Sequence, residues 1–181
     1  DLWVVCGQDS TVPLSTYKIY SYLLTASGIN TVPVISSVNV LSDPATSGIG
    51  FLRPSPDGRR LAIGSRRNVF PATYSVALSD FDRTTGILNN SYLARTINNA
   101  QGGLSYFEFS PDGSKLYTVE YPSTIVQLDL CAASPAAVIA SANTVVTLPA
   151  VSTYSFYRGI QRAINGYIYL SQWTSQGFSN S

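Results

Sequence analysis

The sequence predicts an all-β fold, a β-propeller built from four-stranded antiparallel blades. Three observations support this fold class. The composition favours strands, with 12 Tyr, 7 Phe and many Val, Ile and Thr residues, whose side chains suit a pleated surface. The tetrapeptide SPDG occurs at residues 55–58 and again 55 residues later, at 110–113. Apolar and polar residues alternate around both copies, and hairpins that recur at such a period are typical of propeller blades.

Each SPDG copy is predicted to form the corner of a hairpin. Proline presets the first corner of a tight turn, Asp can hydrogen-bond its own backbone, and Gly accepts a positive φ. A degenerate third copy, Ala163-Ile164-Asn165-Gly166, follows at a step of 53 residues, with Asn and Gly in the same role. The predicted corner residues are Pro56, Asp57, Gly58, Pro111, Asp112, Gly113, Asn165 and Gly166.

Four strands are expected in each complete repeat, two around the corner and two after it, with a polar turn between the third and the fourth. The opening segment fits the second, third and fourth strands of an earlier unit. The stretches expected to form strands are 2–8, 16–28 and 32–41 in the first unit, 50–53, 60–64, 73–82 and 91–97 in the second, 105–109, 115–119, 124–130 and 143–148 in the third, and 158–164 and 167–173 in the last.

The predicted domain is a partial propeller of a little over three blades. It consists of a blade part at 1–45, blades at 46–100 and 101–152, and a blade part at 153–181. Propellers generally close with about four to eight blades, and the chain contains no Met, so we expect a fragment of a longer protein. The remaining blades or other protein chains would then cover its two ends. A two-sheet sandwich is the structural alternative, but it would not need one turn at equal intervals.

Composition and charge exclude two classes of partner. Charged residues make up 12% of the chain, the net charge is +1, and no basic run is longer than Arg59-Arg60 or Arg66-Arg67, so the footprint of a nucleic-acid binder is missing. No apolar run reaches the roughly 18 residues that span a bilayer.

The two cysteines, Cys6 and Cys131, are expected to be small buried residues or, alternatively, to form a disulfide.

The absence of histidine makes catalysis the weaker expectation. Without His, the chain cannot form a Ser-His-Asp or Cys-His system or a His-ligated zinc site, and it has no nucleophile-elbow or phosphate-loop motif. We therefore predict no catalytic residue and no cofactor. Asp80 and Asp82 are weak candidates for a metal site, since their spacing is faintly like that of a calcium loop. The alternative is an Asp-started turn closed by Gly86.

Polar residues recur at one position on the first strand of each repeat. Arg53, Glu108 and Gln161 each stand four residues before the Asp or Asn of a corner, on the strand that lies nearest the channel of a propeller. We consider them candidates for lining a ligand or ion site, with Arg158 and Arg162 as neighbours. The alternative is that they meet only water at the channel.

Four segments, taken in order, resemble a known family of propellers. These are GFLRPSPDGRRLAIGS, LSDFDRTTGILNN, YFEFSPDGSKLYTVE and IVQLDL, which are similar to a propeller in large secreted proteins of gliding bacteria, exported by the type IX secretion system. Residues 3–5 and 20–28 also match that family. Two features depart from it: the last corner has Ala163-Ile164-Asn165-Gly166 where Gly-Pro-Asp-Gly is usual, and Cys6 replaces Thr or Val.

The resemblance implies a secreted or cell-surface module without catalytic activity. Such a module would serve protein–protein interaction, adhesion, gliding motility or extracellular assembly, so its partners would be other protein chains or the remaining blades. Fold alone does not determine function, and two alternatives stay open. One is a propeller enzyme of the sugar-lactone lactonase type. The other is a lectin-like propeller that stacks carbohydrate on tyrosines such as Tyr17, Tyr20 and Tyr22.

Overall fold

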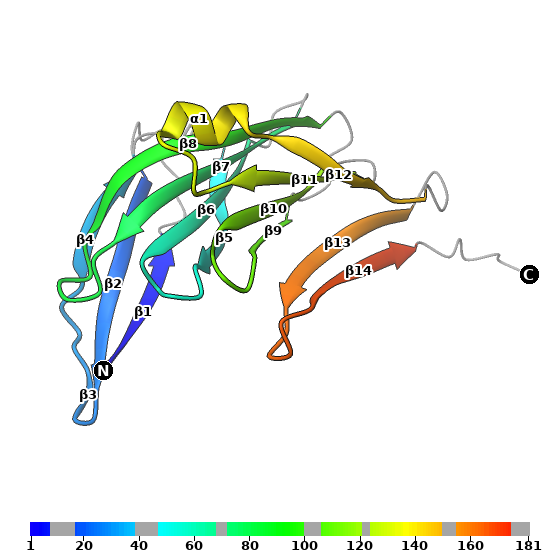
Figure 1. Ribbon diagram of the computed structural model, residues 1–181. Coiled ribbons are helices and arrows are strands. Elements are labelled where there is room, and N and C mark those ends of the chain that lie inside the picture. Colours follow the sequence, from blue (N-terminus) through cyan, green and yellow to red (C-terminus); the bar gives the residue numbers. More distant parts are fainter. Residues whose placement is uncertain are drawn as a thin grey trace, which may run out of the picture. The chain divides into compact units, whose positions relative to one another are not determined.

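Over the residues that it describes, the structure is an all-β arrangement of antiparallel sheets with one short helix (Figure 1). The computed structural model describes residues 1–7, 17–38, 47–67, 72–99, 106–120, 124–149 and 155–174. At 47–50, 66–67, 72, 98–99, 155–158 and 172–174 it describes the backbone only. The described chain divides into two compact units, residues 1–102 and 103–181. Among the described residues, no helix has the length and apolar character needed to cross a membrane.

The described residues of the unit 1–102 form two sheets. In the first sheet, β2 lies between β1 on one side and β3 and β4 on the other. In the second sheet, four strands pair in chain order. The strands of the first sheet are β1 (Leu2–Gly7), β2 (Tyr17–Thr25), β3 (Gly28–Ile29) and β4 (Val34–Val38). Those of the second sheet are β5 (Ser47–Pro54), β6 (Arg60–Arg67), β7 (Ala72–Phe81) and β8 (Leu88–Asn99).

The unit of residues 103–181 contains a third sheet of four strands, also paired in chain order, and a fourth sheet of two described strands. The third sheet consists of β9 (Tyr106–Phe109), β10 (Lys115–Glu120), β11 (Thr124–Asp129) and β12 (Asn143–Thr147). The fourth consists of β13 (Ser155–Arg162) and β14 (Ile168–Thr174). Four antiparallel strands in chain order form the meander that the repeat predicts.

A helix stands where a polar turn was predicted between the third and fourth strands of the third sheet. Helix α1 covers Pro135–Ala140. Ser134 caps it, because its hydroxyl accepts a hydrogen bond from the N–H of Ala137 at 3.2 Å, and proline is well tolerated at the first helical position. The hydroxyl of Ser141 ties the helix to β11, since it accepts from the N–H of Asp129 at 2.7 Å.

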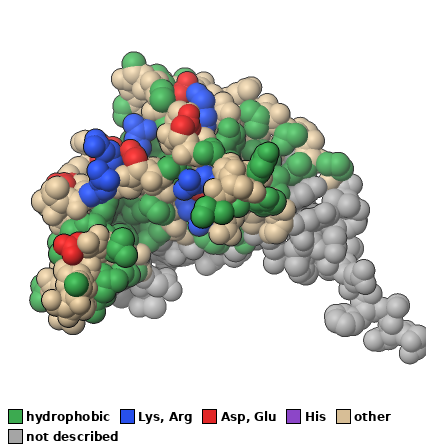
Figure 2. Space-filling view, turned by 60° about the horizontal axis from the view of Figure 1, so that its bottom comes forward, with side chains coloured by type: hydrophobic (Ala, Val, Ile, Leu, Met, Phe, Trp, Pro, Cys, Tyr) green, Lys and Arg blue, Asp and Glu red, His purple; other side chains and the backbone are tan. Residues whose placement is uncertain are grey.

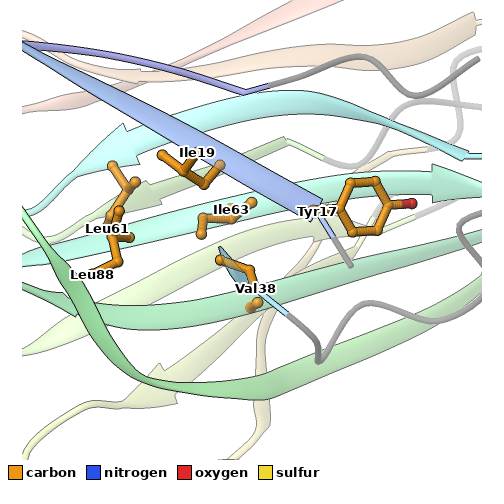
Figure 3. Packing of buried hydrophobic residues seen from close by; sticks show 7 residues of the cluster. Tyr17, Ile19, Val38, Leu61, Ile63 and Leu88 are labelled. Atoms are coloured by element: carbon orange, nitrogen blue, oxygen red, sulfur yellow. The ribbon is translucent and has the colours of Figure 1, made fainter. Parts of the chain in front are cut away.

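The first and second sheets pack face to face through an apolar cluster (Figure 3). From the first sheet come Tyr17, Ile19 and Val38, and from the second come Leu61, Ile63, Ala77 and Leu88, all buried. Alternation along β2 directs Tyr17, Ile19 and Ser21 to this face. Burying one large apolar side chain contributes about 1.5–3 kcal/mol, so this cluster is the main source of cohesion between the two sheets. A buried hydrogen bond adds to it, from the N–H of Leu88 to the hydroxyl of Ser36 at 2.9 Å.

The prediction for the cysteines was wrong. Cys6 and Cys131 are both exposed, and both are free thiols. Cys6 lies on the face of β1 that points away from the second sheet, together with Leu2 and Val4. Cys131 follows β11 in a turn at the surface, where its N–H donates to the carboxylate of Asp129 at 3.0 Å.

Candidate functional site

The three polar positions predicted to line a channel occupy equivalent places in their hairpins. Arg53 on β5, Glu108 on β9 and Gln161 on β13 each stand two residues before the corner turn. Their surroundings differ, because Arg53 is half-buried, Glu108 is buried at 3% exposure and Gln161 is exposed. The sequence therefore predicted their register on the strands but not their environment.

Glu108 holds β9 and β13 together with its carboxylate. One oxygen, Oε1, accepts a hydrogen bond from the N–H of the next residue, Phe109, at 2.9 Å. The other, Oε2, accepts from the N–H of Arg162 at 3.0 Å. Hydrogen bonds from backbone N–H groups to a charged carboxylate are the strong kind, and a buried carboxylate requires such partners. Glu108 thus has a structural role in this unit.

The guanidinium group of Arg162 has an N–H donor that bonds to none of the described residues. Its side chain is half-buried, and its Nε is buried without a hydrogen-bond partner among the described residues. A guanidinium has five N–H donors and accepts nothing, so this group suits an anionic oxygen. Arg158 lies on the same strand, β13, at a position where the structure describes the backbone only.

The two SPDG corners have the same hydrogen bonds. In the first, the Ser55 hydroxyl donates to Asp57 Oδ1 at 2.6 Å and accepts from the N–H of Arg60 at 2.9 Å. In the second, the Ser110 hydroxyl donates to Asp112 Oδ1 at 2.6 Å and accepts from the N–H of Lys115 at 2.9 Å. The glycine closes each turn in the left-handed region, at φ 67° and 73°, where a side chain would be strained.

These bonds stabilise the charged form of both corner carboxylates. The Ser110 hydroxyl, with the N–H and hydroxyl of Ser114, lowers the pKa of Asp112 to about 2. The Ser55 hydroxyl, followed by the N–H of Arg59, lowers the pKa of Asp57. Hydrogen bonds donated to a carboxylate favour its ionised form. Both side chains therefore act as acceptors within their own turns.

The third corner is a shorter version of the other two. The N–H of Gly166 donates to the carbonyl of Ala163, as Gly113 does to Ser110, and Gly166 has a φ of 82°. Asn165 takes the place of the corner Asp, and its Oδ1 accepts from the N–H of Tyr167 at 3.1 Å. Because Ala163 has no hydroxyl, this corner lacks the bond that a serine supplies in the other two.

The loop that follows β7 forms a turn around Asp82. Oδ1 of Asp82 accepts from the N–H and hydroxyl of Thr84 at 2.8 and 2.7 Å, and Oδ2 accepts from the hydroxyl of Thr85 at 2.8 Å. These donors, with the Thr84 hydroxyl first, lower the pKa of Asp82 to about 2. Asp80 accepts separately from the side-chain amide of Asn90 at 2.9 Å. Among the described residues, no group of three His, Cys, Asp or Glu side chains is placed to hold a metal.

The same loop contacts β1 through Trp3, a contact that sequence analysis did not anticipate. The indole N–H of Trp3 donates to the carbonyl of Arg83 at 2.8 Å, and the ring packs edge-on against Phe81 at 6.2 Å between centroids. Arg83 in turn donates to the carbonyl of Asp57 at 3.1 Å. The contact joins residues 80 positions apart, so local patterning gives no signal for it.

Charges of both signs share the surface. On the face shown in Figure 2, the described Lys and Arg side chains and the Asp and Glu side chains are interspersed, and neither sign forms a continuous patch. Lys115 and Asp129 form an exposed ion pair at 2.9 Å. Such pairs contribute only about 0–1 kcal/mol, so we assign this one no functional role.

No family model matches the sequence, and no curated protein matches it closely enough to count as a relative. Several solved structures match, and two of them are provisionally named 6-phosphogluconolactonases. The one from Bacteroides uniformis has a TM-score of 0.51 and 20% sequence identity, over 86% of this chain and 43% of its own. The one from Bacteroides fragilis has a TM-score of 0.45 and 16% identity, over 72% of this chain and 33% of its own. The chain thus spans less than half the length of either structure.

The likeness to the Bacteroides uniformis structure concerns the fold. It indicates that the antiparallel sheets of this chain have a propeller-like fold. At 20% identity it does not extend to function, because one fold supports many unrelated activities.

Proposed function

We propose that this chain forms consecutive blades of a lactonase-type β-propeller that binds and hydrolyses a sugar lactone. The observation that carries the proposal is the fold likeness across 86% of the chain to a structure provisionally named a 6-phosphogluconolactonase. The four sheets supply the blades, and the SPDG motif or its shorter form turns the first hairpin of the second, third and fourth sheets. We also propose that further blades complete this propeller and close it.

Arg162, on the first strand of the fourth sheet, supplies a group that such a substrate requires. A phosphorylated sugar lactone carries an anionic group and develops negative charge on its carbonyl oxygen when water attacks. Positioned donors at that oxygen are a large term in catalysis of this kind. The buried Nε of Arg162, which has no acceptor among the described residues, is the group we assign to an anionic oxygen.

The test is hydrolysis of 6-phosphogluconolactone, followed by titrating the acid released and compared with the spontaneous reaction. We expect the protein to exceed the spontaneous rate. Arg162→Gln should lower the catalysed rate about tenfold or more, since a hydrogen bond to a charged group contributes roughly 1.5–3 kcal/mol. Arg59→Gln, which changes an exposed corner arginine, is the matched control and should leave the rate unchanged. A rate equal to the spontaneous one would contradict the proposal.

A second candidate is a secreted, cell-surface propeller module without catalytic activity, in line with the resemblance to type IX secretion substrates. The observation that favours it is the use of acidic side chains within the fold. Asp57, Asp82 and Asp112 accept hydrogen bonds inside their own turns, and Glu108 joins two strands. Such carboxylates serve structure rather than acid–base chemistry.

Localisation and lactone hydrolysis together separate the two candidates. The surface module should be labelled on intact producing cells by a reagent that does not cross membranes, and it should leave lactone hydrolysis at the spontaneous rate. Protection from that reagent, together with absence from the culture medium, would eliminate this second candidate.

A further inference from the structure

The first sheet has an apolar face that nothing in the described protein covers. Alternation along the strands places on it Leu2, Val4 and Cys6 from β1, Tyr20, Tyr22 and Leu24 from β2, and Ile35 from β4, with the polar Lys18 and Ser37 at one end. We call these residues the open face. Leu2, Val4 and Ile35 are 68%, 44% and 54% exposed. Leu2 stands opposite Leu24, and Val4 opposite Tyr22, so the apolar side chains form one continuous surface across β1 and β2.

The opposite face of the same sheet shows what this sheet packs against. There, Tyr17, Ile19 and Val38 are at most 2% exposed and contact the second sheet. A sheet with two apolar faces is typical of an inner layer, which needs a neighbour on both sides. Contiguous exposed apolar surface of this kind marks an interaction site.

The repeat identifies the kind of neighbour. In the second sheet, Leu61, Ile63 and Ala77 lie on the face that is directed toward the sheet before it in the chain, which is the first sheet. The open face is the equivalent face of the first sheet. In the second sheet, these three side chains are at most 4% exposed, and the first sheet covers them. The partner that fits the open face is therefore another antiparallel sheet of this repeat.

The fourth sheet presents the face that, in the repeat, is directed toward a following sheet. On the third sheet, the face that bears Glu108 is the one that meets the following sheet, at the N–H of Arg162. The equivalent face of the fourth sheet bears Gln161, paired with Tyr169. Gln161 is exposed and Tyr169 is 56% exposed. If the repeat continued, the next sheet would pack its own equivalent of the open face against this surface. A second copy of the chain can therefore place its fourth sheet against the open face.

We propose that two copies of this protein associate head to tail, with the open face of one covered by the fourth sheet of the other. The inference rests on the propeller fold of the proposed function. The contact is heterologous, since it joins two different surfaces.

The two free cysteines provide the test, since both are exposed but only Cys6 lies on the open face. The full chain is treated with a maleimide at increasing protein concentration, and labelling at each cysteine is followed by mass spectrometry. By mass action, labelling of Cys6 should slow about tenfold once roughly nine-tenths of the open faces are covered. Labelling of Cys131 should change less than about twofold over the same range, because most of its surroundings remain free.

Variants locate the contact, and sedimentation velocity measures the association. Val4→Lys with Ile35→Lys should give monomers whose Cys6 reacts at the same rate at all concentrations, and Tyr169→Lys should do the same from the other side. Val145→Lys, which also replaces an exposed valine but on β12, is the matched control and should associate normally. Monomers of the unaltered protein at all concentrations, or association that survives both sets of substitutions, would overturn the proposal. The lactone assay reads the proposed activity separately from this contact.

Discussion

The carboxylate of Glu108 bridges two backbone N–H groups that occupy the same place in successive repeats. One belongs to Phe109, directly after Glu108, and the other to Arg162, 54 positions after Glu108. Phe109 and Arg162 are each the last residue of a first strand before its corner. In the second sheet the residue at this place is Pro54, which follows Arg53 and has no N–H to donate. An acidic residue at position 53 would therefore lack the hydrogen bond that Glu108 accepts from the N–H of the next residue.

Replacing Glu108 with Gln should destabilise the unit of residues 103–181. Glutamine presents one carbonyl oxygen instead of two, and its NH₂ group would face an N–H that is itself a donor. We expect a loss of about 1–3 kcal/mol, the cost of leaving a buried donor unsatisfied, measured from urea unfolding. Glu120→Gln, at a half-buried position on β10, is the control and should cost less, because a glutamine carbonyl can still accept the hydrogen bond from the hydroxyl of Thr118. Equal unfolding midpoints for the two variants would show that the bridge contributes nothing.

The strands and corners could be predicted from sequence because their causes are local. The Ser-Pro-Asp-Gly turn builds its hydrogen bonds within six residues, from Ser55 to Arg60, and alternation marks the strands beside it. Helix α1 was missed although its signal was also local, since Ser134 followed by Pro135 is a common helix start. The burial of Glu108 could not be predicted, because it depends on β13, far along the chain. The contact between Trp3 and Arg83 escaped prediction for the same reason.

The Asp112 carboxyl should titrate well below an ordinary Asp. Its folded pKa is about 2, against 3.8 for an unperturbed aspartate, so its contribution to stability is present above about pH 4 and is lost as the pH falls toward 2. NMR titration of the side-chain carboxyl carbon measures this directly. Ser110→Ala removes the largest cause and should move the midpoint of Asp112 upward. The pKa of Asp57, whose partner Ser55 is unchanged, serves as the internal control. An unchanged Asp112 midpoint in that variant would refute the assignment to Ser110.

Calcium should not stabilise the loop that carries Asp80 and Asp82. Both oxygens of Asp82 already accept hydrogen bonds from Thr84 and Thr85, and Asp80 accepts one from Asn90. Calcium normally takes about six to eight oxygen ligands. To use these carboxylate oxygens, it would have to displace the hydrogen-bond donors that already occupy them. We expect the thermal unfolding midpoint to be the same with millimolar calcium and with a chelator. A calcium-dependent rise that disappears in Asp82→Asn would instead reveal a metal site in this loop.

Gly86 and Trp3 are closely matched in shape, and this predicts a strong effect of adding one methyl group. Gly86 has a φ of 76°, in the left-handed region, and a Cβ there would lie 2.6 Å from atoms of the Trp3 ring. Gly86→Ala therefore forces the indole to move and weakens its bond to the carbonyl of Arg83. The left-handed backbone alone costs a non-glycine residue about 1–3 kcal/mol. We expect the total loss in urea unfolding to exceed this range.

A double-mutant cycle separates the two causes of that loss. In a Trp3→Ala background, the atoms that meet the new Cβ are gone, so Gly86→Ala should then cost only the backbone strain. Gly166→Ala provides an independent measure of that strain. Its φ of 82° is similar, and the nearest atom to its Cβ is 3.8 Å away, an ordinary contact. We expect the cost of Gly86→Ala with Trp3 present to be larger than both of these values. If Gly86→Ala costs the same with and without the Trp3 ring, the ring is not held against this turn, and the joining of β1 to the loop after β7 must have another cause.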